Sequence, residues 1–418
     1  MTAFVDPAPG SYRRWFIFAF GSLNFVLSMF YRVSTAVISP ALVRDMNLTS
    51  GQLGDLSAAF YYAFAFSQVP LGIAIDRLGP RLTIACSAVP AVAGAVVFAL
   101  GETSNQLILG RALLGIGMSG NMVVILTLLA AWFPVNRFAF LSGTAVSVGV
   151  LGNLLAATPL ALLSVWLGWR GSFLFFAAVN AVTVTAFFVV VRDYPKGAAP
   201  TRAKSGSVLS GLGTLAGMYS YWAISLSNFI RYGYFAALQS LWIGPFLIFG
   251  VGLGEVAAGN ALLALGVGYM AGLPLWGTLS DRILRSRKNV ALPTMVAFCL
   301  VILSILWWGP GVPSWILLGT CFLLGFTAGP GQILYAHIKE LVPPTIIARA
   351  MTSVNFFTII GVAVMIHVLG YALGQIPSSV VGPEPFHPLW YVGVGCVGFV
   401  CVLYAFVPDS QALKPKKR

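Results

Sequence analysis

The chain has 418 residues, 58% of them hydrophobic and 8% charged, and its mean hydropathy is +0.90. The chain has too few polar side chains to form the surface of a water-soluble globular protein of this size. The composition therefore indicates an integral membrane protein. The formal net charge of +13 would suit nucleic acid or anionic lipid as a partner, and the placement of the charges along the chain decides between them.

Long apolar runs separated by short polar segments follow one another along the chain. They are longer than the alternating strands of a membrane β-barrel, so we expect helices. We predict an all-α membrane protein with twelve transmembrane helices in two six-helix pseudo-symmetric halves. The predicted spans are 15–39, 52–75, 82–101, 106–131, 139–165, 171–191, 215–248, 256–279, 290–309, 314–337, 350–375 and 388–407.

The first residues, 1–14, lack the short apolar core and the cleavage site of a removable signal, so we expect the first span to be retained. A segment rich in Pro, Gly, Ser and basic residues, 192–207, separates spans 6 and 7. The predicted domains are an N-terminal six-helix bundle (1–191), a cytoplasmic linker (192–214), a C-terminal six-helix bundle (215–407) and a basic cytoplasmic tail (408–418).

The basic residues are distributed unevenly between the loops. With the N-terminus in the cytoplasm, the outer loops hold only Arg44 and Arg170, and Arg32, Arg111 and Arg231 lie within spans. The positive-inside rule then predicts that both termini are cytoplasmic, in a multi-pass protein of the cell inner membrane. Basic loops facing an anionic leaflet explain the surplus charge without nucleic acid.

Two segments that follow corresponding spans repeat each other: "PLGIAIDRLGPR" (70–81) after span 2 and "PLWGTLSDRILR" (274–285) after span 8. "LLGIGMSG" (113–120) in span 4 likewise matches "LLGFTAGP" (323–330) in span 10. These matches indicate a duplicated six-helix unit, a transporter plan that places the substrate near the membrane midplane between repeats.

The first of these loops resembles the loop signature of the major facilitator superfamily, and the second is a degenerate copy of it. The residues that carry the resemblance are Gly72, Asp76, Arg77, Gly79 and Arg81, then Gly277, Asp281 and Arg282. In the family these loops form a cytoplasmic latch, which the resemblance implies here for Asp76, Arg77, Arg81, Asp281 and Arg282. The alternative is that their charges only orient the chain.

Two arginines lie within spans at about the same depth, Arg32 in span 1 and Arg231 in span 7. A charged side chain in the hydrocarbon costs about 2.5–3.5 kcal/mol by insertion scales, so it normally faces water or a partner. The acidic residues fall in loops, tails or span ends, and none is expected at midplane. We therefore predict that the two guanidiniums bind an anionic solute in a central cavity.

Polar residues at helical spacing extend the stripes on which these arginines lie. The full set of predicted substrate-binding residues is Arg32, Arg231, Tyr31, Asn24, Asn228, Tyr232, Gln239, Tyr335 and Gln332.

Other titratable or charged groups in the spans each have more than one possible role. Arg111, at the start of span 4, is assigned to gating, with a snorkelling structural role as the alternative. Asp55, His367 and His337 are candidates for proton coupling, since histidine changes its charge near neutral pH. A buried, satisfied histidine is the alternative for His367.

Residues 31–81 resemble the first two helices of the superfamily's anion-transporting branches, the organophosphate/phosphate exchangers and organic-acid symporters, which have an arginine at the position of Arg32. "IRYG" (230–233) is similar to span 7 of the organophosphate exchangers. Those exchangers carry a histidine in the stretch that corresponds to 143–153, which has none here, and this argues against phosphate chemistry. The start of the first segment also resembles bacterial amino-acid carriers.

Neither a phosphate-binding GxxxxGK[ST] loop nor a catalytic or metal-ligand cluster is present, and no CxxC pair occurs, so we predict no enzyme activity and no cofactor. We predict a monomeric secondary active transporter of a small organic anion, a carboxylate, working by alternating access as a proton-coupled symporter or exchanger. The alternatives are an amino-acid uptake carrier, a drug or lipophile efflux pump, and a non-transporting membrane sensor or scaffold.

Overall fold

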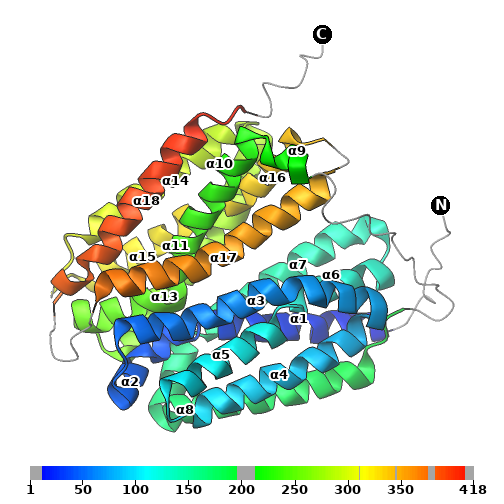
Figure 1. Cartoon of the computed structure of the whole chain (residues 1–418), viewed down its shortest axis with the longest axis horizontal. Coiled ribbons are helices and arrows are strands. Elements are labelled where there is room, and N and C mark those ends of the chain that lie inside the picture. The colour runs from blue at the N-terminus through cyan, green and yellow to red at the C-terminus, as the bar shows by residue number, and fades with distance from the viewer. Residues whose placement is uncertain (1–11, 195–211, 310, 344–345, 375–381, 410–418) are drawn as a thin grey trace. The chain divides into compact units, whose positions relative to one another are not determined.

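The computed structural model describes residues 12–194, 212–309, 311–343, 346–374 and 382–409 (Figure 1). Every regular element in these ranges is helical. Ten of the described helices are long and apolar enough to cross a membrane, and an eleventh apolar helix, Leu141–Leu155, is shorter. The predicted all-α membrane fold is confirmed.

The elements before the linker match predicted spans 1 to 6. They are α1 (Arg13–Val33), α2 (Thr35–Met46), α3 (Ser50–Leu78), α4 (Pro80–Leu100), α5 (Ser104–Met118), α6 (Asn121–Trp132), α7 (Val135–Leu155) and α8 (Thr158–Val190). The long α8 consists of two helices joined at Gly168, whose φ of 67° lies in the left-handed region that glycine adopts without strain. Spans 5 and 6 therefore meet at this glycine.

The elements after the linker match spans 7 to 12. They are α9 (Leu212–Ala216), α10 (Tyr219–Ser227), η1 (Asn228–Tyr232), α11 (Gly233–Ala237), η2 (Leu238–Trp242), α12 (Ile243–Pro245), η3 (Phe246–Gly250), α13 (Glu255–Thr278), η4 (Leu279–Ile283), α14 (Lys288–Ile305), α15 (Ser314–Ala328), α16 (Gly331–Leu341), α17 (Ile347–Leu373), η6 (Glu384–Phe386) and α18 (His387–Ala405). Span 7 alternates α-helix with the π-helical turns η1, η2 and η3.

Three predicted spans are interrupted where a continuous helix was expected. Span 1 breaks at Ser34, between α1 and α2, and span 4 breaks between α5 and α6. Span 10 breaks at Gly329 and Pro330, between α15 and α16, where proline has no N–H for the helical hydrogen bond. Each break frees backbone groups that need other partners.

The chain forms two compact units. Unit 1 comprises Met1–Ile38 and Ala59–Lys204, and unit 2 comprises Ser39–Ala58 and Ser205–Arg418. The segment 39–58, which contains α2 and the beginning of α3, thus packs with elements that follow the linker.

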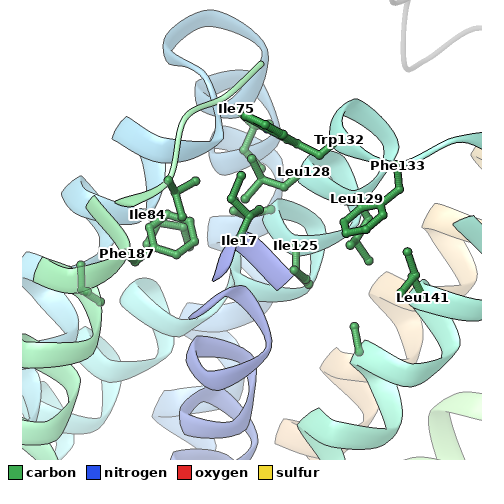
Figure 2. Packing of buried hydrophobic residues seen from close by; sticks show 14 of the residues in the cluster. Ile17, Ile75, Ile84, Ile125, Leu128, Leu129, Trp132, Phe133, Leu141 and Phe187 are labelled. Carbon is green, nitrogen blue, oxygen red and sulfur yellow. The ribbon is translucent and has the colours of Figure 1, made fainter. Parts of the chain in front are cut away.

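A buried apolar cluster joins one end of the helices of unit 1 (Figure 2). Ile17 of α1, Leu128 of α6 and Phe187 of α8 meet in it. Trp132 packs in the same cluster and donates from its indole Nε1 to the carbonyl oxygen of Arg192, 2.8 Å away. The cluster therefore fixes the end of α8 against α6.

Glycines allow the closest helix contacts inside each unit. In unit 2, a Cβ atom on Gly325 of α15 would overlap the carbonyl oxygen of Leu265 on α13, and one on Gly268 would overlap that of Phe322. In unit 1, a Cβ on Gly94 of α4 would lie 2.7 Å from the carbonyl oxygen of Gly110 on α5. Small residues at such positions let membrane helices approach closely without hydrophobic driving force.

We expect Gly325→Ala to lower the thermal unfolding midpoint of the purified protein by several degrees, since overpacking costs about 1–3 kcal/mol. The matched control is Gly319→Ala on the same helix, where a Cβ meets nothing within 4 Å. Equal midpoints for the two variants in a thermal melt would show that the α13–α15 contact is looser than described.

Candidate functional site

The broken end of α1 has its freed carbonyls satisfied by side chains of unit 1. The Nη1 of Arg111, on α5, donates to the carbonyl oxygen of Tyr31 at 2.7 Å. The Tyr61 hydroxyl donates to the carbonyl oxygen of Arg32 at 3.1 Å, and Ser34 donates to that of Tyr31 at 3.2 Å. The positive charge of Arg111 also interacts favourably with the dipole of α1, because it lies near the C-terminus of that helix.

Arg111 is fully buried, with its guanidinium carbon 4.7 Å from the centre of the Phe60 ring. Its Nε and Nη2 have no hydrogen-bond partner among the described residues. The residue therefore ties span 4 to the end of α1, and its predicted part in gating stays a prediction.

Arg231 makes the corresponding contact in unit 2. It lies in the π-helical turn η1, is 1% exposed, and donates from Nη1 to the carbonyl oxygen of Ala328 at 2.7 Å. Ala328 is the last residue of α15, so this contact also satisfies a carbonyl at a break. The Nε and Nη2 of Arg231 have no partner in the described part of the chain.

Those two nitrogens form one edge of the planar guanidinium, the edge that binds a carboxylate through two parallel hydrogen bonds. Nη2 lies against Gly331, the first residue of α16, where a Cβ would be only 2.6 Å away. No side chain caps this 11-residue helix at its start. A helix N-terminus carries positive partial charge, so helix and guanidinium both favour an anion.

No acid neutralises these cations within the described residues. The ion pairs there with N···O distances up to 4.0 Å include neither Arg32 nor Arg231. The titratable groups that interact electrostatically with Arg231 are instead those of Tyr269, Tyr232, Tyr335 and Cys401. The Tyr335 hydroxyl lies 3.2 Å from Asn355 Oδ1 and 3.0 Å from Thr358 Oγ1.

Arg32 lies in the last turn of α1, in unit 1, and is partly exposed. Its guanidinium carbon stands 4.7 Å from the centre of the Phe64 ring, a cation–π contact, and its Nε has no described partner. Unlike Arg111 and Arg231, it makes no hydrogen bond to a helix end in the described residues.

The other predicted binding residues differ in what they can still bind. Asn228 is 1% exposed with both amide atoms unpartnered among the described residues, and the Tyr31 hydroxyl is likewise buried and unpartnered. Asn24 donates within its own helix, to the carbonyl oxygen of Phe20 at 2.9 Å. Gln239 is buried and Tyr232 is partly exposed.

The side chains of Gln332 and Asp76 lie outside the described part of the chain. Of the remaining residues of the first loop signature, Arg77 is exposed. Arg81 donates from Nε to the carbonyl oxygen of Phe188 at 2.7 Å, and its backbone N–H donates to Asp193 Oδ1 at 2.6 Å. These contacts lie inside unit 1, and the sequence reasoning missed Asp193, which satisfies the start of α4.

In the second loop copy, Asp281 contacts an arginine that was not among the predicted residues. Arg287 contacts Asp281 and donates from Nη2 to Glu340 Oε1 at 2.8 Å, whereas Arg282 is exposed. Partial burial lowers the pKa of Arg287, but its hydrogen bonds to Glu340 and Asp281 outweigh burial, so that pKa is raised. Glu340 lies in the last turn of α16, beyond the predicted span 10, and nothing in the repeat indicated it.

Two of the three proton-coupling candidates lie together. His367 Nε2 is 2.7 Å from Asp55 Oδ1, and both residues belong to unit 2. His337 is buried elsewhere, with Nδ1 2.7 Å from the Tyr404 hydroxyl and Nε2 3.1 Å from the carbonyl oxygen of Pro408. Both of its ring nitrogens therefore tie α16 to the end of α18.

Comparison with solved structures shows the same fold over nearly the whole chain. A bacterial homologue of the human lysosomal transporter Spinster, in an inward-facing and occupied conformation, matches with a TM-score of 0.72 at 17% identity, over 95% of this chain and 97% of that one. A D-xylose–proton symporter matches with a TM-score of 0.73 at 15% identity, over 96% and 98%.

Relatives of similar sequence differ in the solutes that their names give. A chloramphenicol resistance protein of Streptomyces lividans is 30% identical over 256 residues, 59% of this chain and 62% of that protein. A probable sulfoacetate transporter of Cupriavidus necator is 26% identical over 289 residues, 65% of each. The alignments thus span less than two thirds of either relative.

The family comparison covers most of the chain. The model of the Major Facilitator Superfamily matches residues 20–357 and, in a second match, residues 224–418. With the helical membrane fold and the loop signature, this match shows that the chain belongs to the Major Facilitator Superfamily and is a multi-pass membrane protein.

Proposed function

We propose that this transporter moves a small organic anion, a carboxylate, across the cell inner membrane. The observation that carries the proposal is the Nε/Nη2 edge of the buried Arg231, which has no partner among the described residues and lies beside the start of α16. A buried guanidinium without an acid is costly in a membrane, so a carboxylate ligand completes its charge and its hydrogen bonds together.

Several relatives bear the names of anion transporters, which supports this class of substrate. Besides the sulfoacetate transporter they include a hexuronate transporter of Bacillus subtilis and a nitrate/nitrite transporter of Nostoc punctiforme. Arg32 and Asn228 are the other binding residues we propose, because each keeps polar atoms without a described partner.

In this proposal both termini are cytoplasmic and the protein is a proton-coupled symporter or exchanger that acts as a monomer. The loops containing Asp76, Arg77 and Arg81 and containing Asp281 and Arg282 act as the cytoplasmic latch of the cycle. Arg287, which contacts Asp281, is an addition to this set.

Efflux of a lipophilic compound is the second candidate. The chloramphenicol resistance relative favours it, as does an apolar pocket of about 260 Å³ in unit 2, lined by residues that include Trp222, Phe229 and Phe357. In that case the only role of Arg231 would be to donate a hydrogen bond to the carbonyl oxygen of Ala328, at the end of α15.

We expect Arg231→Met to weaken binding of the preferred carboxylate by about 10- to 100-fold, the range of one lost charge-assisted hydrogen bond or two. The measurement is the ligand-induced rise in thermal unfolding midpoint across a panel of carboxylates, organophosphates, amino acids and chloramphenicol. Arg111→Met is the matched control, since it removes a buried arginine that also donates to a helix end. A carboxylate shift that survives Arg231→Met but not Arg111→Met contradicts the assignment.

A second variant tests the site without removing its charge. Gly331→Ala places a methyl group 2.6 Å from the present position of Nη2, at the end of a flexible side chain that can move aside. We expect unliganded stability to change little and carboxylate affinity to fall at least about threefold, since bidentate hydrogen bonds depend on geometry. Unchanged affinity in isothermal titration would show that the ligand does not use this edge.

A further inference from the structure

Two phenylalanines of α3 lie against two arginines of unit 1. Phe60 and Phe64 are four residues apart, so they share one face of the helix, and their rings stack with centres 6.0 Å apart. The guanidinium carbon of Arg111 lies 4.7 Å from the centre of the Phe60 ring, and that of Arg32 lies 4.7 Å from the centre of the Phe64 ring. The four groups therefore form one chain of contacts with an arginine at each end, which we call the aromatic ladder.

Helix packing holds the ladder in place. A Cβ on Gly115, one turn after Arg111 on α5, would lie 2.2 Å from the carbonyl oxygen of Phe60, so α5 and α3 touch through their backbones here. Beside it, the Tyr61 hydroxyl donates to the carbonyl oxygen of Arg32 at 3.1 Å and ties α3 to the end of α1. Phe60 is fully buried and Phe64 is buried as well. The packing therefore keeps the two rings at the level of both arginines.

Neither arginine has an acid that balances its charge. The ion pairs of the described residues include neither Arg32 nor Arg111, and the Nε of each has no hydrogen-bond partner there. A cation in a membrane-spanning segment normally faces water or a partner. The face of an aromatic ring carries negative partial charge, and it attracts a cation more strongly where water is excluded. The ladder can therefore stabilise the two charges in place of a carboxylate.

We propose that Phe64 is the positioning residue of Arg32, and that the aromatic ladder is the counter-group of both arginines. A carboxylate next to Arg32 would occupy its donors and repel an anionic solute. A phenylalanine ring has no lone pairs for the N–H groups of a guanidinium, so it holds the charge and leaves the donors available. What this implies for the solute rests on the proposed function, whereas the placement of Arg32 does not.

Apolar packing of the two phenylalanines is the simpler explanation, and the charge distribution of the rings distinguishes it from the proposal. Fluorine atoms on the ring withdraw negative charge from its face, while the shape of the ring changes little. Fluorination therefore weakens an attraction between a cation and the ring face, but it leaves apolar contacts largely intact.

The first experiment measures how easily a reagent reaches Arg32, and no solute is added. Phenylalanines with one, two or three fluorine atoms replace Phe64, and mass spectrometry follows the modification of each arginine by phenylglyoxal, which reacts with guanidinium groups. Arg77, which is exposed on the same helix, is the internal standard. We expect the rate at Arg32, relative to Arg77, to rise stepwise and to reach about 3- to 10-fold with three fluorines, the range of one cation–π contact.

Phe98 is the matched control for this series. It is a fully buried phenylalanine of the same unit, and its ring contacts those of Trp169 and Phe173. Trifluorination at position 98 should leave the relative rate at Arg32 unchanged. A rate at Arg32 that is the same for every fluorinated ring at position 64, or that rises equally with the control, overturns the positioning role.

The second experiment tests the buried end of the ladder. Trifluorination of Phe60 should lower the thermal unfolding midpoint by about 2–4 °C, the size expected when one cation–π contact is weakened. In Arg111→Met no cation faces the ring, so the same fluorination should have no effect, and the cycle isolates the pair. An equal loss with and without Arg111 shows that the ring only packs, and the shared counter-group is then wrong. Because neither experiment uses a solute, failure here is distinct from failure of the carboxylate assignment.

Discussion

The backbone carbonyls freed by helix breaks are the constraint on which the rest of the structure depends. Within the hydrocarbon no water is available, and an unsatisfied polar group costs several kcal/mol, so each break requires a donor from a neighbouring helix. Arg111 supplies it at the end of α1 and Arg231 at the end of α15. Arg111 and Arg231 therefore have a structural role that does not depend on solute binding.

The two arginines occupy related places in the repeat. Arg111 of span 4 donates to a carbonyl of span 1, and Arg231 of span 7 donates to a carbonyl of span 10. Spans 1 and 4 of the first half correspond to spans 7 and 10 of the second, so the donor and acceptor helices are exchanged. Their surroundings differ: Arg111 lies over the Phe60 ring, whereas Arg231 lies beside Gly331 at the start of a helix. This asymmetry is the reason for proposing solute binding at Arg231 and not at Arg111.

The sequence predicted the spans well because each depends on an apolar run long enough to cross the membrane, a property that is summed over many residues. It did not predict the breaks at Ser34 or Gly329, since serine and glycine also occur inside continuous membrane helices. The π-helical turns of span 7 were missed for a related reason, because they shift the helical spacing on which the stripe through Asn228 and Gln239 was based. Repeat matching named Arg282, but the chain turns so that Arg287 meets Asp281.

The assignment of residues 39–58 to unit 2 has a consequence for biosynthesis. The ribosome makes this segment early, yet α17, which carries the histidine that Asp55 contacts, is among the last helices to be synthesised. During most of translation the side chain of Asp55, at the beginning of α3, is therefore in the bilayer without its contact to His367. Final assembly of unit 2 is therefore a post-insertion event.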